Sequence, residues 1–311
     1  MKRQQAFAKE GKFLKGGLHC HTTRSDGRGD PAEVIRLYKQ NGYDFLALTD
    51  HRNYNYENFA PETGLTIIPG MEFDNPFHTD DDTLHHFHIV CIGPAKADGN
   101  GYEQDERCDS GTAQDQMAFQ PYLDAIHAKK NLTVYCHPEW SKTPAPYFEK
   151  MQGNFAMEIW NSISAIRCGL DTDAAYWDDL LGQGIRIWGV ASDDGHDMEE
   201  HCHGWVRVKA EDQQINTILA ALEDGAFYSS CGPEIHDFWA DDEKIVIECS
   251  PCTTIRLFGD GHPTQVEQDA DGNLTRAEFS LSPVFGPYRY VRATVIDKDG
   301  KKAWTNPIFF D

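Results

Sequence analysis

The sequence lacks any apolar run long enough to cross a membrane as a helix. Such a helix needs about 18 or more consecutive apolar residues, and every hydrophobic stretch of this 311-residue chain is broken by polar residues before that length. No apolar segment follows Lys2 and Arg3, so we also expect no secretory signal. The sequence therefore predicts a cytoplasmic protein without a membrane partner.

Basic residues are scarce as well. The chain has 28 Lys and Arg residues against 50 Asp and Glu residues, which is a formal net charge of -22. Nonspecific binding to duplex nucleic acid draws much of its affinity from Lys and Arg on phosphates, so we do not expect it here. A small phosphorylated substrate remains compatible with this charge, because bound divalent cations would reverse the local sign.

Cysteines cannot all be paired within the chain, because there are nine of them. Cys91 and Cys136 lie in strand-like apolar runs, which favours buried free thiols in a reducing compartment. Cys249 and Cys252 form the one C-x-x-C spacing, and no second such pair accompanies them. We therefore favour a chance pair near a strand end over a zinc site.

The order of apolar patterns predicts an α/β fold followed by a β-rich region. Strand-like and helix-like segments alternate as far as Gly225, which implies parallel crossovers. Short strands joined by Asp-Gly turns follow, so we predict one domain over residues 1–234 and a C-terminal β-sandwich-like domain over residues 235–311. The acidic, glycine-rich stretch 97–114 is predicted to be a long exposed insertion, either a lid or an inert loop.

Histidines and carboxylates gather at the downstream ends of the apolar runs. The segments concerned are His19-Cys20-His21 with Asp26, Thr49-Asp50-His51, Gly70-Met71-Glu72, His85-His86-Phe87-His88, Cys136-His137-Pro138 and Asp193-Asp194-Gly195-His196. Strands that each deliver one imidazole or carboxylate to a common end are how a barrel builds a metal site. A single histidine is more often structural, but six such segments together predict a hydrolytic metalloenzyme.

The donor types indicate which metals and which chemistry to expect. His19 and His21 alternate on an extended segment, so both side chains face one way and can share an ion, whereas Cys20 faces the other way. Imidazoles suit Zn, Mn or Fe, and carboxylates such as Glu72 add hard oxygen ligands. A carboxylate that bridges two cations would serve phosphoryl-group chemistry.

The motifs resemble those of the PHP (polymerase and histidinol phosphatase) superfamily. The matching segments are His19-x-His21 with Ser25-Asp26-Gly27, Leu48-Thr49-Asp50-His51, Pro69-Gly70-Met71-Glu72, His137-Pro138 and Asp194-x-His196. The resemblance covers about residues 15–235, and the β-rich sequence after Phe227 resembles the subgroup with a small C-terminal β domain. It implies a distorted seven-stranded β/α barrel, two or three divalent metal ions (Mn, Fe or Zn), and mostly phosphoester hydrolysis.

The resemblance also implies a set of metal ligands. These are His19, His21, Asp26, His51, Glu72, His88, His137, Asp194 and His196. His85 or His86 could take the place of His88, and Asp193 that of Asp194. His196 is in addition a candidate for proton transfer, as is His51.

Residues outside this set have weaker signals. Arg24, Arg28 and Arg52 lie beside ligands and could bind a substrate phosphate by paired hydrogen bonds, with Arg52 as the first choice. Other residues are expected as follows: Asn161 as a pocket or capping residue, His201 and His203 as exposed imidazoles, and Trp140, Trp160 and Trp188 as core residues.

The leading hypothesis is a metal-dependent phosphoesterase that uses a metal-bound hydroxide. Its substrate would be a phosphomonoester or phosphodiester of a small metabolite, a nucleotide or a short oligonucleotide. One alternative is a metal-dependent hydrolase of a carboxylic ester or carbamate on the same site, and another is a non-catalytic metal-binding interaction module. The sequence identifies neither the substrate nor the oligomeric state.

Overall fold

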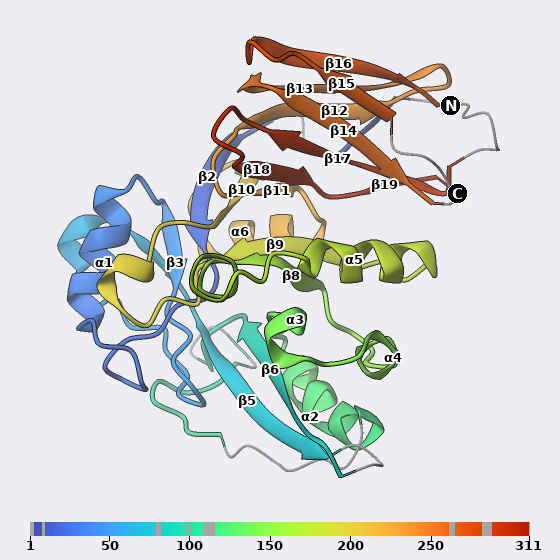
Figure 1. Cartoon of the computed structure of the whole chain (residues 1–311). Helices are drawn as coiled ribbons and strands as arrows, with labels where there is room; N and C mark the ends of the chain where they lie inside the picture. Colours follow the sequence, from blue (N-terminus) through green and yellow to red (C-terminus); the bar gives the residue numbers. More distant parts are fainter. Residues whose placement is uncertain are drawn as a thin grey trace.

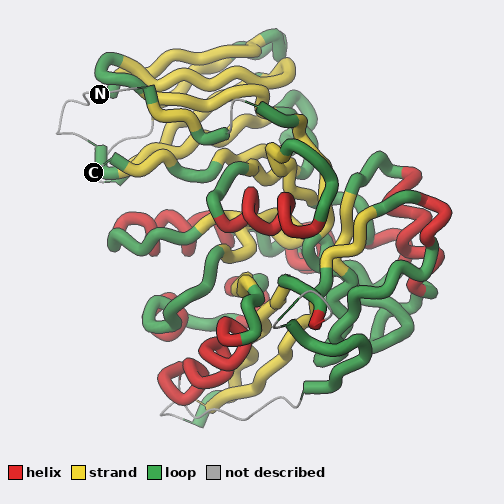
Figure 2. Tube along the Cα trace, turned by 180° about the vertical axis from the view of Figure 1, so that it is seen from behind, coloured by secondary structure: helices red, strands yellow, loops and turns green. Residues whose placement is uncertain are grey.

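The computed structural model describes residues 3–7, 10–78, 82–96, 99, 101–108, 116–260, 265–281 and 288–310. Figure 1 shows the helices on one side of the stacked C-terminal strands, and both termini lie beside those strands (Figures 1 and 2). Among the described residues, no helix combines the length and the apolarity needed to cross a bilayer.

The N-terminal part begins with parallel strands. β2 (Lys12–Gly17), β3 (Phe45–Ala47) and β4 (Thr66–Ile68) pair in parallel, and α1 (Pro31–Gln40) connects the first two. The side chain of Asp30 accepts the backbone N–H of Ala32, which satisfies one of the free donors at the start of α1. This segment therefore folds as the cap and the apolar pattern predict.

The next two strands form a hairpin that the sequence prediction missed. β5 (Gly70–His78) and β6 (Leu84–Ile92) are antiparallel over their whole length, and β6 is also antiparallel to β7 (Leu132–Tyr135). The prediction of parallel crossovers is wrong here. A parallel connection needs a dozen or more residues, and only residues 79–83 join β5 to β6.

The chain then returns to parallel pairing. β7, β8 (Ala156–Asn161) and β9 (Trp188–Ser192) lie side by side in parallel. The helices of this part are α2 (Gln116–Ala128), α3 (Pro138–Ser141), α4 (Ala145–Phe148) and α5 (Asp173–Gly182). The strand order of this sheet is β5-β6-β7-β8-β9. A mixed α/β fold is thus confirmed for the part of the chain that carries the histidine motifs.

The C-terminal part is β-rich, as predicted. Its elements, with those that lead into it, are β10 (Trp205–Ala210), α6 (Ile215–Glu223), β11 (Phe227–Ser230), β12 (Ile235–Ala240), β13 (Lys244–Cys252), β14 (Thr254–Gly259), β15 (Gln265–Gln268), β16 (Leu274–Ser280), β17 (Tyr290–Ile296), β18 (Lys302–Thr305) and β19 (Ile308–Phe309). Two layers pack through one apolar core, to which Phe238 and Ile247 contribute from one layer and Leu257 and Val295 from the other.

Sheet hydrogen bonds connect the C-terminal strands to the rest of the chain. β18 pairs with β11, and the short N-terminal strand β1 (Gln4–Gln5) pairs with β12. The longest sheet therefore runs β15-β14-β17-β18-β11-β10-β2-β3-β4, with β19 on β17. The division of the chain at residue 235 stays a prediction.

All nine cysteines are free, and Cys91 and Cys136 are buried, as predicted. The sulfur atoms of Cys249 and Cys252 lie 3.7 Å apart in β13. Neither belongs to a group of potential metal ligands among the described residues.

Part of the predicted insertion lies outside the described residues, namely 97, 98, 100 and 109–114. The prediction that the segment is exposed is confirmed for Glu103, Asp105 and Arg107 but wrong for Gly101 and Tyr102. Tyr102 is buried, with its ring centre 4.9 Å from that of Tyr54, and the backbone N–H of Tyr54 donates to the carbonyl of Glu106 at 3.1 Å. One aromatic ring and backbone hydrogen bonds hold this stretch against the segment that follows His51.

Candidate metal centre

The strand ends bring the predicted ligands together. His19 and His21 follow β2, His51 follows β3, and His137 follows β7, while Asp194 and His196 follow β9. Carboxyl ends of parallel strands meet at one end of a sheet, which explains this convergence. Glu72 and His88 arrive differently, from within the antiparallel hairpin of β5 and β6.

The strand exit at residues 19–21 faces two environments. The Nε2 atoms of His19 and His21 lie 3.2 Å apart. Cys20 is buried on the other side, where its thiol donates to the carbonyl of Ala47 at 3.4 Å. The alternation of an extended chain therefore separates the two imidazoles from the cysteine.

Glu72 lies at the middle of the imidazoles. Its Oε2 atom is 3.3 Å from His19 Nε2, 3.2 Å from His21 Nε2 and 3.2 Å from His51 Nδ1. Its Oε1 atom is 2.9 Å from His88 Nδ1 and 3.7 Å from His137 Nε2. Within the described part of the chain, Glu72 Oε2 and His51 Nδ1 have no hydrogen-bond partner. Two buried acceptor atoms thus point at a space that a cation would fill.

The described residues form four groups of donor atoms, in each of which all atoms lie within 4.8 Å of one another. One group is His19, Cys136 and Glu158, and the other three consist of predicted ligands alone. The central group is His19, His21, Glu72 and Asp194. The His88 group is Glu72, His88 and His137, and the Asp26 group is His21, Asp26, His51 and His196. Glu72 belongs to two groups and so could connect two cations.

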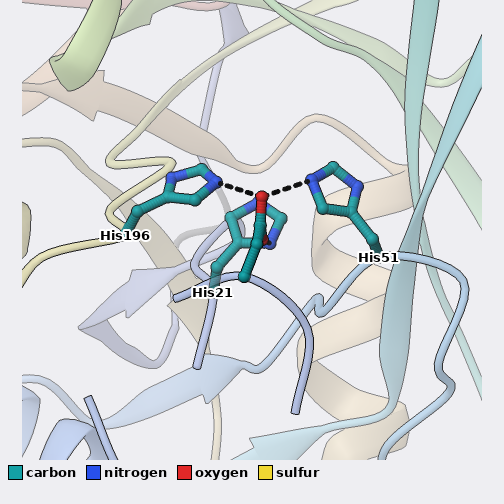
Figure 3. A group of neighbouring side chains, drawn as sticks. His21, His51 and His196 are labelled. Atoms are coloured by element: carbon teal, nitrogen blue, oxygen red, sulfur yellow. Dashed lines mark ion pairs between the residues drawn. The ribbon is translucent and has the colours of Figure 1, made fainter. Parts of the chain in front are cut away.

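Figure 3 shows the Asp26 group, with His51 and His196 directed at one carboxylate oxygen. That atom is Oδ2 of Asp26, 3.6 Å from His51 Nε2 and 3.4 Å from His196 Nε2. Asp26 is the most exposed member of the three groups, so this group lies at the solvent side of the site.

Glu158 fixes the orientation of two of the imidazole-bearing segments. Its Oε1 atom lies 2.8 Å from His19 Nδ1, and its Oε2 atom accepts the backbone N–H of His137 at 2.8 Å. An ionised carboxylate only accepts, so Nδ1 of His19 carries a proton, and Nε2 is the ring nitrogen that faces the central group. A carboxylate behind a histidine ligand in this way is typical of metal sites.

Asn161 extends the same network. Its side-chain nitrogen donates to Glu158 Oε2 at 2.9 Å and to Asp194 Oδ2 at 3.2 Å, while its oxygen accepts the backbone N–H of Ser164 at 3.0 Å. The residue therefore positions Asp194 and caps the turn after β8. Of the two roles considered from the sequence, capping is confirmed, whereas Asn161 is buried and is not one of the described residues that line the pocket.

The buried carboxylates of this cluster need positive charge close by to stay ionised. Burial disfavours the charged form of His21, but hydrogen bonds to Asp194 and Glu72 outweigh that effect and raise its pKa to about 10. Burial likewise opposes ionisation of Glu72, yet the neighbouring imidazoles hold its pKa well below the usual range. Protons or cations can supply the positive charge that these carboxylates require, and cations displace protons from imidazoles.

Asp193 and Asp194 have separate roles. Asp194 Oδ1 lies 3.0 Å from His21 Nε2. Asp193 faces the interior, where its carboxylate accepts from the hydroxyls of Tyr38 and Ser162 and from backbone N–H groups of residues 202–204. The structure thus places Asp194 among the donor atoms and Asp193 in the support of the neighbouring loop.

The histidines of β6 separate in a similar way. His88 contacts Glu72 directly, whereas His86 is exposed, with its ring centre 6.1 Å from that of His88. His85 stacks near Tyr147 instead. Neither His85 nor His86 belongs to a donor group among the described residues.

Comparison with known proteins places this geometry in a family. Residues 17–159 match the sequence model of the PHP domain. By this match, residues 17–159 form a PHP domain. A 5'-3' exoribonuclease of Haemophilus influenzae is 39% identical over 62 residues, which are 19% of this chain and 23% of that protein. The matched stretch thus spans less than a quarter of that relative.

Solved structures add two likenesses. A two-domain protein from Bacteroides vulgatus, which contains a predicted PHP-like metal-dependent phosphoesterase, is 13% identical with a TM-score of 0.49, covering 99% of this chain and 98% of that one. A metal-dependent phosphoesterase from Bifidobacterium adolescentis is 13% identical with a TM-score of 0.42, covering 66% and 96%. Both scores lie below 0.5, so neither likeness bears on the activity of this chain.

The donor groups of the PHP domain open into a pocket of about 340 Å³. Seven members of the predicted ligand set line it, together with four residues that the sequence analysis did not assign to the site. These four are Trp140, Ile163, Ser164 and Arg167. They lie on α3 and on a π-helical turn, Ile163–Arg167, that directly follow His137 and β8.

Two side chains differ from their predicted environment. Trp140 is 41% exposed at the pocket, so its assignment to the core is wrong. His201 is buried against Tyr38 rather than exposed, with ring centres 5.4 Å apart. The environments of Trp140 and His201 both depend on how a short irregular segment packs against the rest of the chain. The hydrophobic periodicity of the sequence does not predict such packing.

The arginines beside the ligands are already paired. Arg52 Nε lies 2.8 Å from Asp74 Oδ1, Arg24 pairs with Asp105, and Arg28 with Asp197. Among the described residues that line the pocket, Arg167 is the one arginine or lysine. Its guanidinium contacts Glu200, whose other oxygen accepts the backbone N–H of His196 at 2.9 Å.

Proposed function

We propose that this PHP domain is a metal-dependent phosphoesterase that binds two or three divalent cations. The observation that carries the proposal is Glu72, whose buried carboxylate faces imidazoles of two donor groups and keeps one oxygen without a hydrogen-bond partner among the described residues. Mixed nitrogen and oxygen donors suit Mn, Fe or Zn. The central, His88 and Asp26 groups would each hold one ion, with Asp26 the most exposed ligand.

We also propose that the domain is the distorted seven-stranded barrel of this superfamily. Its seven strands would be β2, β3, a nearly continuous strand made of β4 and β5, and then β6, β7, β8 and β9. Two backbone bonds support closure between the first and last: Asp194 donates to the carbonyl of His19, and His21 to that of Gly195, each at 3.0 Å. Such closure would bring all donor segments to one end.

The chemistry follows from the charges around the pocket. Divalent ions held there would polarise a phosphoryl group and lower the pKa of a coordinated water, so that water rather than a side chain attacks phosphorus. Arg167 would hold a non-bridging phosphate oxygen, because it is the pocket's arginine and Glu200 fixes its position. His196 donates Nδ1–H to the carbonyl of Asp194 at 2.8 Å, which leaves Nε2 free for an ion or for proton transfer beside Asp26.

The substrate would be a phosphate ester of a small molecule or nucleotide. A pocket of about 340 Å³ is at the small end of the range for ligand sites. The experiment uses Mn²⁺-loaded protein and measures the inorganic phosphate released from phosphomonoesters and the phosphomonoester and alcohol released from phosphodiesters, with carboxylic esters and carbamates in parallel. Hydrolysis in oxygen-18 water should place one label in the released phosphate, whereas a trapped phosphorylated side chain would contradict direct attack by water.

The two candidate arginines provide a matched test of phosphate binding. We expect Arg167→Met to raise KM about tenfold or more, because a charge-assisted bond to phosphate is lost. Arg52→Met should change KM less than about twofold, since Arg52 does not line the pocket and its guanidinium contacts Asp74 instead. A larger rise in KM for Arg52→Met than for Arg167→Met would show that Arg52 binds the phosphate. Cleavage of carboxylic esters alone would replace the phosphoesterase assignment by the alternative hydrolase.

A further inference from the structure

Trp140 is the one exposed tryptophan of the chain. It lies on the single turn of α3 that follows His137, and its ring centre is 5.0 Å from that of His137 and 5.8 Å from that of His88. Its indole therefore contacts two residues of the His88 group, and the rest of its surface lines the pocket. Trp140 thus presents part of an aromatic ring to the pocket, where a ligand could contact it.

The two ends of the donor cluster differ in character. Trp140 contacts members of the His88 group, whereas Arg167 is connected through Glu200 to the backbone of His196 in the Asp26 group. Ile163 adds a second apolar side chain to the pocket wall. A molecule seated over the cluster would thus meet an aromatic surface at one end and a guanidinium at the other.

We propose that Trp140 is a stacking platform for a planar ring carried by the substrate, which makes the substrate class an aryl or heteroaryl phosphate ester. This inference rests on the proposed phosphoesterase function and assigns the leaving group. Stacking uses the face of the ring, so it favours a flat ring over a puckered ring of the same size. It requires no hydrogen-bond readout of the ring. Trp140 is then a specificity-determining residue and not a ligand.

Two phosphonates that cannot be hydrolysed separate this effect from leaving-group chemistry. Phenylphosphonate and cyclohexylphosphonate share charge and approximate size and differ in planarity. Their dissociation constants for Mn²⁺-loaded protein are measured by calorimetry. We expect phenylphosphonate to bind about tenfold more tightly, which corresponds to a stacking preference within the usual range.

Variants assign the preference to one side chain. Trp140→Leu should remove most of the preference for the flat ring, and Trp140→Phe should keep part of it. Ile166→Ala is the matched control, because Ile166 is also an exposed apolar residue but lines the neighbouring pocket instead. Its ratio of the two dissociation constants should equal that of the unchanged protein.

The outcomes distinguish the two proposals. Equal binding of both phosphonates, or an unchanged ratio in Trp140→Leu, would overturn the stacking platform and leave the phosphoesterase function standing. Absence of binding for both probes in metal-loaded protein would overturn the phosphate-binding function and the platform with it. A circular dichroism spectrum of each variant that matches the unchanged protein shows that the effect is local.

Discussion

The PHP domain and the C-terminal strands bury different kinds of residue. The domain buries His19, His21, Glu72, His137, Glu158 and Asp194 within a few ångströms of one another. After residue 235, within the described residues, Arg292 is the only buried charged side chain. It is held by Asp178 of α5, with Nε 2.6 Å from Oδ1, and its guanidinium lies over the rings of Trp177 and Phe258.

This difference shows what each region is built to do. Burial of a charge is costly unless a partner compensates it. The one buried charge of the C-terminal strands, that of Arg292, is paired with Asp178 of α5. These strands otherwise bury apolar and uncharged polar side chains among the described residues. The PHP domain instead buries carboxylates and imidazoles close together, and some of their atoms have no hydrogen-bond partner among the described residues. Cations bound to these atoms would stabilise the folded domain.

The largest expected effect comes from removing the shared charge of the metal centre. Glu72→Gln keeps the shape but lowers the negative charge on the two groups, so metal content and turnover should fall together, turnover by on the order of 1000-fold. Elemental analysis and steady-state kinetics measure the two quantities. Glu267→Gln, an exposed residue of β15, is the control. Full metal content with normal turnover in Glu72→Gln would disprove the bridging role.

The second effect tests the C-terminal side of the comparison. Arg292→Ala leaves Asp178 without its partner and removes two ring contacts, so the free energy of unfolding should fall by about 3 kcal/mol. Denaturant titration measures it. Arg276→Ala, an exposed ion-pair residue of β16, should cost less than about 1 kcal/mol. Metal binding by folded Arg292→Ala should be unchanged, and a joint loss of metal affinity would show that the two regions are coupled.

The third effect tests the role of Glu158, whose carboxylate contacts His19 and the backbone of His137. Glu158→Gln can still accept from the backbone of His137, but it no longer fixes the proton of His19 electrostatically. We expect Mn²⁺ affinity to fall about 10- to 100-fold, as for other residues that orient histidine ligands. Titration of metal-free protein measures it independently of activity. Retained affinity would mean that Glu158 serves packing only.

The smallest effect concerns pH. Without cations, His21 has its pKa raised to about 10 and is protonated at neutral pH. A cation requires the neutral imidazole, so loading should release protons, and affinity should rise with pH by up to about tenfold per unit below pH 10. Mn²⁺ titrations at pH 6.5, 7.5 and 8.5 measure this slope. An affinity that is flat over that range would contradict a protonated metal-free centre.

The local elements were largely predictable from sequence because their signals are local. Asp30 and Pro31 start α1, Gly42 ends it, and the apolar run before Thr49 forms β3. The expected donor residues were visible for the same reason, since each follows or interrupts a strand-like run. The antiparallel hairpin of β5 and β6 was not, because periodicity is the same in both directions of a strand.

Three residues of the site had no comparable signal. Glu158 lies inside an apolar strand, where an acidic residue is unusual. The sequence does not give the reason, which is the contact of its carboxylate with His19. Trp140 and Arg167 belong to a single helical turn and a π-helical turn, whose direction depends on what they pack against. Arg52 is adjacent to a ligand in sequence, yet its side chain pairs with Asp74.

The sequence by itself determined which donor types are present and on which face of each strand they lie, because alternation and capping depend on neighbours along the chain. Tertiary structure alone decided that Glu72 stands between two groups of imidazoles, that Asp194 rather than Asp193 faces them, and that Trp140 and Arg167 form the pocket wall. Those outcomes depend on contacts between segments that are well separated along the chain, such as Glu72 with His88 and His19 with Asp194, and on the balance of burial against charge at the place where they meet.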